Sequence, residues 1–312
     1  MRILFMGTPD FAAECLKKVH SHPDAEIVGA VTQPDKPKGR GMKMIAPPVK
    51  VFAEENGIPV YQPATLKDGT FEEELESLDP ELIIVAAYGK ILPSYIIDYP
   101  KYGCVNAHAS LLPRHRGAAP INRAIMEGDS VTGVTAMYMD YGLDTGDMIL
   151  KLETDITDDD DAGALHDRLA EMGGEAMCRT IDMILSGSVM RTAQSDDGAT
   201  YAAKIMKEDC KVDFTGSARD VFNFIRGLSP YPGAITKTQD GKLLKLTGAR
   251  ISDKNNGGAV PGTVIALDGT ISVACGDGAV EITAVIPEGK GRMSAADYIR
   301  GRKISVGDVL SI

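Results

Sequence analysis

Three polar side chains alternate with alanines just beyond an apolar segment. This stretch reads Asn106-Ala107-His108-Ala109-Ser110 and follows the run GCV. Alternate residues of an extended chain project to the same side, so Asn106, His108 and Ser110 are expected to share one side. An amide and an imidazole placed together are suited to stabilise an oxyanion or to move a proton. The simpler interpretation, that Asn106 and His108 only satisfy buried backbone groups at a strand end, stays open at this point.

Two loops further along the chain have distinctive compositions. The first runs from Ser110 to Pro120 and contains Arg114 and Arg116 before a closing Ala-Ala-Pro, which is typical of a helix start. An irregular loop with two arginines indicates a site that binds a ligand. The second loop, MDYGLDTGD, is rich in Gly and Asp and lies between two apolar runs. As a plain hairpin turn it would need no further explanation, because Asp and Gly are common turn residues.

The elements that must position these loops follow a repeated strand, turn and helix pattern. Residues 2–6 are apolar, the following GTPD is typical of a turn and helix cap, and residues 11–19 have apolar positions at helical spacing. The apolar run 82–89 and the next one, from Gly103, are typical of strands buried in a parallel sheet. Alternating strands and helices predict an α/β domain with a Rossmann-like, doubly wound parallel sheet. Ligands bind beyond the carboxyl ends of such strands, where the alternating polar residues lie.

The pattern changes in the last third of the chain. Residues 189–210 are polar and irregular, and a single short helix is expected at 218–227. Short strands then recur about every ten residues between Gly- and Asp-rich turns. This spacing predicts a smaller C-terminal β-barrel, OB-like, after the α/β domain. The expected boundaries are 1–189 for the first domain, 190–207 for a linker and 208–312 for the barrel.

The charge balance excludes a strong overall attraction to polyanions. The 312 residues include 33 Lys and Arg against 44 Asp and Glu, a net charge of -11. Such a chain has no global positive field for nucleic acid or for an anionic membrane. The segment 35–43 is a local exception, with four cations among nine residues. By composition alone such a segment is more often a solvated loop than a nucleic-acid contact.

Other features argue against metal, NAD and membrane binding. The pair His20-x-His22 lacks a nearby third ligand, so no metal site is expected. The first turn, Gly7-Thr8-Pro9, is not G-x-G-x-x-G, so no NAD site is expected. The five cysteines contain no C-x-x-C pair, as expected for free thiols in a reducing compartment. With neither a signal peptide nor an apolar stretch of about 18 residues, we expect a cytoplasmic protein without a membrane partner.

The long motifs together resemble those of a known family. NAHASLLPRHRGAAPI and MDYGLDTGDM resemble signatures of the formyltransferases that use 10-formyltetrahydrofolate. Within that group, MGTPDFA, TQPDKPKGRG and the C-terminal PEGKGRMSAADYIRG resemble the methionyl-tRNA formyltransferase family. The resemblance covers nearly the whole chain. It implies transfer of a formyl group from 10-formyltetrahydrofolate to the α-amino group of methionyl-initiator tRNA, for translation initiation. One departure is His115, where relatives usually carry an aromatic residue.

The resemblance also implies roles for individual residues. The catalytic residues it implies are Asn106, His108 and Asp144. The residues it implies for the folate site are Ser110, Leu111, Leu112 and Pro113. The residues it implies for tRNA binding, in and around the Gly39-Arg40-Gly41 loop, are Lys36, Lys38, Arg40 and Lys43. The partners are then initiator methionyl-tRNA and the folate co-substrate, with no metal and no NAD, and we expect a monomer.

Two alternatives remain at the level of the sequence. The same catalytic trio could serve a small amine, such as a ribonucleotide glycinamide or an amino sugar, or could transfer the formyl group to water. The length argues against a small amine, because about 100 C-terminal residues and the GRG loop would then have no task. In the other alternative, the chain is a tRNA-binding or chaperone module with a vestigial trio.

Overall fold

The chain packs into two compact units, each assembled from three stretches of sequence. The computed structural model describes residues 1–38, 42–67 and 69–311. The first unit comprises Met1–Pro120, Val131–Thr154 and His166–Ala202. The second unit comprises Ile121–Ser130, Asp155–Leu165 and Ala203–Ile312. Most of the stretch 190–207, which the composition indicated as a linker, therefore packs with the first unit.

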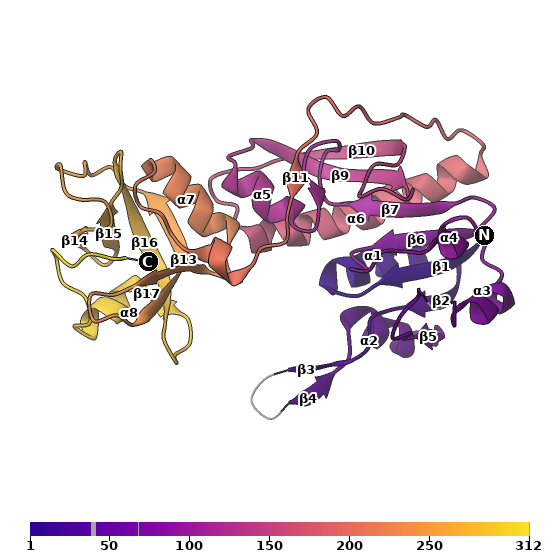
Figure 1. Cartoon of the computed structure of the whole chain (residues 1–312), viewed down its shortest axis with the longest axis horizontal. Helices are drawn as coiled ribbons and strands as arrows, with labels where there is room; N and C mark the ends of the chain where they lie inside the picture. Colours follow the sequence, from indigo (N-terminus) through magenta and orange to yellow (C-terminus); the bar gives the residue numbers. More distant parts are fainter. Residues whose placement is uncertain (39–41, 68, 312) are drawn as a thin grey trace. The chain divides into compact units, whose positions relative to one another are not determined.

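The first unit is built on one mixed sheet (Figure 1). Its strands are β1 (Arg2–Gly7), β2 (Glu26–Val31), β5 (Val60–Tyr61), β6 (Leu82–Ala86), β7 (Cys104–His108), β9 (Val131–Tyr138) and β10 (Met148–Asp155). They lie in the order β10-β9-β7-β6-β1-β2-β5. The strands from β7 to β5 are parallel, and β9 is antiparallel to β7. The chain reverses its direction of winding between β1 and β6, as in a Rossmann-like sheet. The predicted fold class is confirmed.

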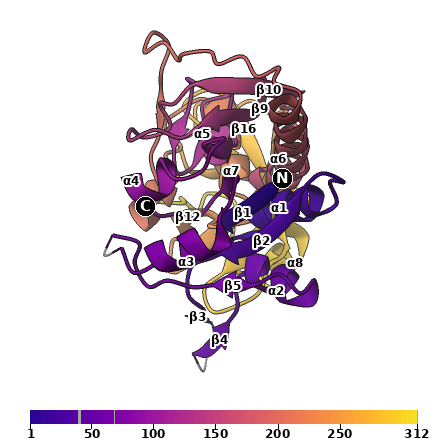
Figure 2. The ribbon, with the colours of Figure 1, turned by 90° about the vertical axis from the view of Figure 1, so that its right-hand side faces the viewer.

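Helices cover both faces of this sheet. They are α1 (Asp10–His20), α2 (Pro48–Glu55), α3 (Glu72–Leu78), α4 (Ser94–Ile97) and α6 (Ala162–Leu185). Figure 2 shows α1 and α6 on one face and α3 and α4 on the other. A glycine lets α6 approach α1 closely, because a Cβ at Gly173 would lie 2.9 Å from Cys15 Sγ. Packing on both faces explains why the strands are continuous apolar runs.

The second unit is an antiparallel sheet that closes on itself. Its strands are β12 (Ala234–Lys237), β13 (Leu243–Ile251), β14 (Val264–Leu267), β15 (Ile271–Ala274), β16 (Ala279–Pro287) and β17 (Met293–Ser294). The order is β12-β13-β16-β15-β14, with β17 beside β16. The C-terminal segment bridges the two edges, because Ser311 pairs with Lys237 of β12 and Val309 pairs with Thr263, next to β14. Closure removes the exposed edges of the sheet and makes the unit a barrel.

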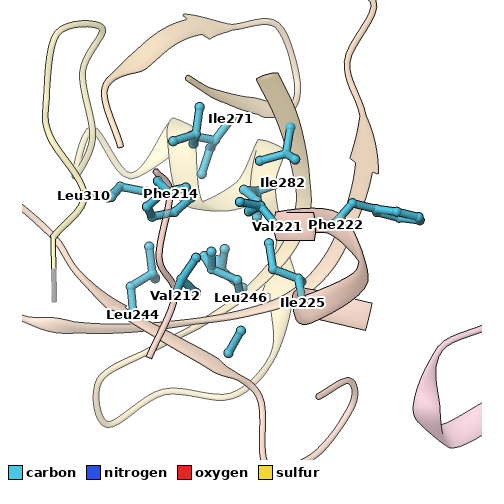
Figure 3. Close-up of a cluster of buried hydrophobic side chains, with 14 of the residues drawn as sticks. Val212, Phe214, Val221, Phe222, Ile225, Leu244, Leu246, Ile271, Ile282 and Leu310 are labelled. Atoms are coloured by element: carbon cyan, nitrogen blue, oxygen red, sulfur yellow. The ribbon is translucent and has the colours of Figure 1, made fainter. Parts of the chain in front are cut away.

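The barrel encloses an apolar core that includes one amphipathic helix. This helix is α7 (Ala218–Gly227), and α8 (Ala295–Arg300) packs against β16 and β17. In Figure 3, Val221 and Ile225 of α7 point toward Leu246 and Ile282 of the sheet. Ser217 caps α7 by accepting a hydrogen bond from the backbone N–H of Asp220, which satisfies one of the unpaired N–H groups at the helix start.

Several short elements complete the chain. They are β3 (Lys36–Lys38), β4 (Lys43–Ile45), β8 (Arg116–Gly117), α5 (Pro120–Met126), β11 (Tyr201–Ala202) and a 3-10 turn at Lys207–Cys210. β3 and β4 form a hairpin, and β8 pairs with β11 in parallel. None of the helices in the described part of the chain combines the length and the apolar character needed to cross a membrane.

Candidate active site

Asn106 and His108 lie two positions apart in β7, at the carboxyl end of the parallel strands. Asn106 is opposite Val85 of β6 and Met137 of β9 in the strand register, and His108 is opposite Thr135. The Asn106 side chain is partly exposed and forms no hydrogen bond with any residue that the structure describes. Its amide is therefore available to a ligand, whereas the imidazole of His108 is almost fully buried.

The contacts of His108 determine which ring nitrogen is available for proton transfer. Nε2 lies 2.9 Å from the backbone carbonyl oxygen of His115. A carbonyl oxygen can only accept, so Nε2 must carry the hydrogen and donate it. Nδ1 lies 3.7 Å from Oδ2 of Asp144. Nε2 is therefore committed to the backbone, and Nδ1 is the ring nitrogen that faces the Asp144 carboxylate.

Asp144 reaches His108 because its loop folds back along the sheet. Tyr138, at the end of β9, is opposite Val105 near the beginning of β7, yet the Asp144 carboxylate lies beside His108 at the end of β7. Oδ2 of Asp144 accepts a hydrogen bond of 2.7 Å from the backbone N–H of Gly117. The backbone of Asp144 is left-handed, with φ 53°, a conformation that Asp tolerates better than most residues.

The loop that carries Asp144 is held by contacts of its own. The carboxylate of Asp140 accepts hydrogen bonds from the N–H of Gly142 and from the hydroxyl of Thr145. Gly146 packs directly on the end of β9, because a Cβ there would lie 1.9 Å from the carbonyl oxygen of Tyr138. The Gly and Asp residues of this loop therefore do more than form a simple turn, since they fold it back toward β7.

The segment 110–113 continues from β7 and forms one wall of the same region. Ser110 and Leu112 are fully buried. The hydroxyl of Ser110 donates to the carbonyl oxygen of Arg114 at 2.6 Å, and the hydroxyl of Thr135 donates to the carbonyl oxygen of Ser110 at 2.7 Å. The peptide bond between Leu112 and Pro113 is cis. These hydrogen bonds determine the shape of the loop, and Leu111 is partly exposed.

A second group of residues lies at the switch point between β1 and β6. Thr8 follows β1, Tyr88 follows β6 and Gln33 follows β2. The carbonyl oxygen of Tyr88 accepts hydrogen bonds from the hydroxyl of Thr8 at 3.3 Å and from the amide of Gln33 at 2.8 Å. Burial raises the pKa of the Tyr88 phenol to about 12, so it stays neutral. The sequence predicted that a ligand binds at this edge of the sheet. It did not predict the hydrogen bonds between these residues.

The basic hairpin of β3 and β4 begins next to this switch point. Lys36 is opposite Ile45, and its ammonium donates to the side-chain oxygen of Gln33 at 2.8 Å. The register also pairs Lys38 with Lys43. Arg40 and its two glycines lie outside the described residues.

A polar cluster holds the base of that hairpin. The amide of Gln62 donates to the carboxylate of Asp35 at 2.8 Å, and the ammonium of Lys50 donates to both carboxylate oxygens, at 3.0 and 2.9 Å. The Gln62 hydrogen bond and then the Lys50 ammonium hold the pKa of Asp35 below its usual range. Asp35 therefore remains a carboxylate at neutral pH, and it keeps Lys50 beside the hairpin.

One stretch that the sequence did not connect with the site crosses it. Residues 192–202, here named the strap, contribute Gln194 and Thr200. The amide of Gln194 donates to two backbone carbonyls of the Asp144 loop, and the hydroxyl of Thr200 accepts from the N–H of His115. The strap ends in β11, paired with β8. Its polar, irregular composition gave no signal for these contacts, which join residues about 50 to 85 positions apart.

Fold and site together define a protein of the formyl transferase class. The family described as formyl transferase matches residues 1–181, and the formyl transferase C-terminal domain matches residues 204–303. Methionyl-tRNA formyltransferase of Geotalea daltonii is 47% identical over 98% of this chain and 97% of its own length. That of Marinobacter nauticus is 48% identical over 97% of each chain. The chain belongs to the methionyl-tRNA formyltransferase family.

Solved structures of lower similarity share the fold. HypX from Aquifex aeolicus, in complex with tetrahydrofolic acid, has a TM-score of 0.64 at 19% identity and covers 96% of this chain, which spans 47% of HypX. An N-formyltransferase from Helicobacter canadensis, in complex with folinic acid and dTDP-3-aminofucose, has a TM-score of 0.67 at 18% identity, with 90% and 98% coverage. At these identities the comparison concerns the architecture alone.

The packing of Gly146 leads to a stability prediction. In Gly146→Ala the added methyl group meets the carbonyl oxygen of Tyr138, so the loop must move, and we expect the free energy of unfolding to fall by about 1 to 3 kcal/mol. Gly291→Ala is the control, because no heavy atom lies within 4 Å of its added methyl, and its effect should stay within about 0.5 kcal/mol. Urea denaturation followed by circular dichroism measures both. Equal stability of the two variants would contradict the described packing of the loop.

Proposed function

We propose that the chain transfers a formyl group from 10-formyltetrahydrofolate to the α-amino group of methionyl-initiator tRNA. The observation that carries the proposal is the approach of the Asp144 carboxylate to Nδ1 of His108, two residues along β7 from the unpaired amide of Asn106. This arrangement occurs in a chain whose relatives named methionyl-tRNA formyltransferase match it from end to end. Formyl transfer between two amines requires an oxyanion donor and a path for one proton, and these residue types supply both.

The proposed reaction begins with attack of the uncharged α-amino group on the formyl carbon. A carbon–nitrogen bond forms, and the carbonyl oxygen becomes negatively charged in a tetrahedral intermediate. Asn106 donates its free amide N–H to this oxygen. Removing one such donor in other enzymes commonly costs about 3 to 4 kcal/mol of transition-state stabilisation. The bond to N10 of the folate then breaks, which restores the carbonyl group and releases tetrahydrofolate.

His108 and Asp144 handle the proton in this proposal. The attacking amine must lose one proton, and the departing folate nitrogen must gain one. Nε2 of His108 is held by the carbonyl of His115, so Nδ1 is the ring position that stabilises charge or exchanges a proton. The carboxylate of Asp144 faces that position at 3.7 Å and would stabilise the imidazolium while the proton passes to the folate.

The proposal also includes a folate site, a tRNA-binding surface and a role for each domain. The segment Ser110–Pro113 would line the folate site, with Leu111 as its partly exposed side chain. The basic hairpin would contact tRNA, with Lys36, Lys38 and Lys43 on phosphates and Arg40 at a base edge. The domain of residues 1–189 would be catalytic, 190–207 would connect it to the rest, and the barrel of residues 208–312 would bind tRNA. The enzyme would act as a cytoplasmic monomer, without metal or NAD.

The acceptor can be identified directly. Purified protein is incubated with 10-formyltetrahydrofolate and either initiator or elongator methionyl-tRNA, and both formyl-methionine and tetrahydrofolate are measured. We expect formylation of the initiator species and little of the elongator. Release of tetrahydrofolate without a formylated tRNA would identify water or another amine as the acceptor. With neither product formed, a tRNA-binding module would be the better description.

The role of Asp144 leads to a second expectation. Asp144→Asn keeps the shape of the side chain but removes the negative charge that faces Nδ1 of His108, so kcat should fall by about 100-fold or more. Affinity for tRNA, measured by filter binding, should change by no more than a few fold. Asp182→Asn is the matched control, since Asp182 is exposed on α6 and pairs with His22. Full turnover in Asp144→Asn would rule out the proposed role.

The basic hairpin leads to a third expectation. Arg40→Ala should raise KM for methionyl-tRNA about tenfold while KM for 10-formyltetrahydrofolate stays unchanged, because only the tRNA contact is lost. The control is Arg179→Ala, which removes an exposed cation of α6 that pairs with Glu175. Steady-state kinetics with each substrate varied in turn gives both constants. Unchanged kinetics with tRNA would remove the hairpin from the binding surface.

A further inference from the structure

The side-chain amide of Gln194 joins the strap to the loop that carries Asp144. Its Nε2 donates to the carbonyl oxygen of Asp144 at 2.9 Å and to that of Gly146 at 2.8 Å. Its Oε1 accepts from Nε of Arg116 at 3.1 Å. Both hydrogens and the oxygen of the amide are thus used, and each faces a partner of fixed polarity. The amide can have only one orientation here, which makes it a rigid connection.

Arg116 provides a firm support for this amide. Its side chain is almost completely buried, and its Nη1 lies 3.0 Å from Asp196, whose own side chain is exposed. Arg116 immediately precedes Gly117, whose N–H donates to the Asp144 carboxylate. β8 therefore holds Asp144 in two ways, directly through Gly117 and indirectly through Arg116 and Gln194.

The strap itself is held on both sides of Gln194. Thr192 exchanges two backbone hydrogen bonds with Met148 at the start of β10, at 2.8 and 2.9 Å. On the other side, the carbonyl oxygen of Thr200 accepts from the N–H of Arg116 at 2.8 Å, and that of Ala202 accepts from Ala119 at 3.1 Å. Gln194 thus projects from a segment whose two ends are held by backbone hydrogen bonds.

We infer that Gln194 is a positioning residue for the reaction proposed above. It acts through the backbone of the Asp144 loop and does not itself touch the substrate. Asp144 lies in a left-handed conformation at 3.7 Å from Nδ1 of His108, so a small shift of the loop changes the distance on which the proton transfer depends. Misplacement of a catalytic group by about 1 Å can reduce a rate about 100-fold. Gln194 holds the loop so that the Asp144 carboxylate stays close to Nδ1 of His108.

Two substitutions separate this role from simple anchoring of the strap. Gln194→Leu removes all three hydrogen bonds. Gln194→Glu keeps an acceptor for Arg116, and strengthens that contact with a charge, but places an oxygen against the carbonyls of Asp144 and Gly146. If Gln194 positions Asp144, both variants lose kcat by about 10- to 100-fold while KM for either substrate changes little. If Gln194 only anchors the strap, Gln194→Glu retains wild-type kcat, and the inference is overturned.

A double-mutant cycle and a matched control complete the kinetic test. Once Asp144→Asn has removed the charge that Gln194 positions, adding Gln194→Leu should lower kcat no further, whereas independent effects would multiply. Ser195→Ala is the control, because within the described residues the hydroxyl of Ser195 has one hydrogen bond, from the N–H of Asp197 in the strap, and the variant should retain wild-type kinetics. Multiplying losses in the double variant would contradict the inference.

A readout independent of activity distinguishes this inference from the proposed function. The ring resonances of His108, assigned with a His108→Asn variant, are followed by NMR in the full-length protein. We expect them to move in Gln194→Leu and Gln194→Glu, because the Asp144 carboxylate leaves Nδ1, and to stay in place in Ser195→Ala. If the wild type transfers no formyl group yet the resonances move, the proposed function fails and the positioning role stands. Unmoved His108 resonances would overturn the positioning role in either case.

Discussion

The site depends on one geometric constraint, which is the return of the 139–147 loop along β7. β9 runs antiparallel to β7, so the loop after β9 starts near the beginning of β7. His108 lies at the other end of β7, and the Asp144 carboxylate faces it there. Three contacts overcome this: Gly146 packs on the end of β9, Gly117 donates to the carboxylate, and Gln194 holds the loop backbone. The fold provides the strand ends, and this return path brings the Asp144 carboxylate to them.

The same constraint makes the site preorganised. His108 is buried, and its Nε2 is committed to a backbone carbonyl, so its ring has one orientation, with Nδ1 toward Asp144. Asn106, on the same strand, has a partly exposed amide that forms no hydrogen bond among the residues the structure covers. Groups that are fixed before charge develops need little reorganisation during the reaction, which is how such sites lower a barrier. The hydrogen bonds around β7 hold these groups in place, as the proposed chemistry requires.

The sequence predicted the parts of this structure that depend on local patterns. Apolar runs predicted the strands, helical spacing predicted α1, and alternation predicted that Asn106 and His108 share one side of the chain. It could not give the return of the Asp144 loop, because Gly and Asp favour many turns equally well. Gln194 was hidden for a different reason: its three partners are distant in sequence, and a polar segment between two domains is typical of a linker. The closure of the barrel by Val309 and Ser311 likewise depends on pairing that no local pattern encodes.

The strap both holds the Asp144 loop and joins the first unit to the second. Its backbone is tied at Thr192 and again at Thr200, and Gln194 lies between these points. An insertion or deletion between them would change where the amide lies, even if Asn106, His108 and Asp144 were kept. The strap then continues at Ala203 into the second unit. The segment that leaves the first unit is thus the one that holds the Asp144 loop, so neither the length nor the conformation of this connection can vary freely without altering the distance between Asp144 and His108.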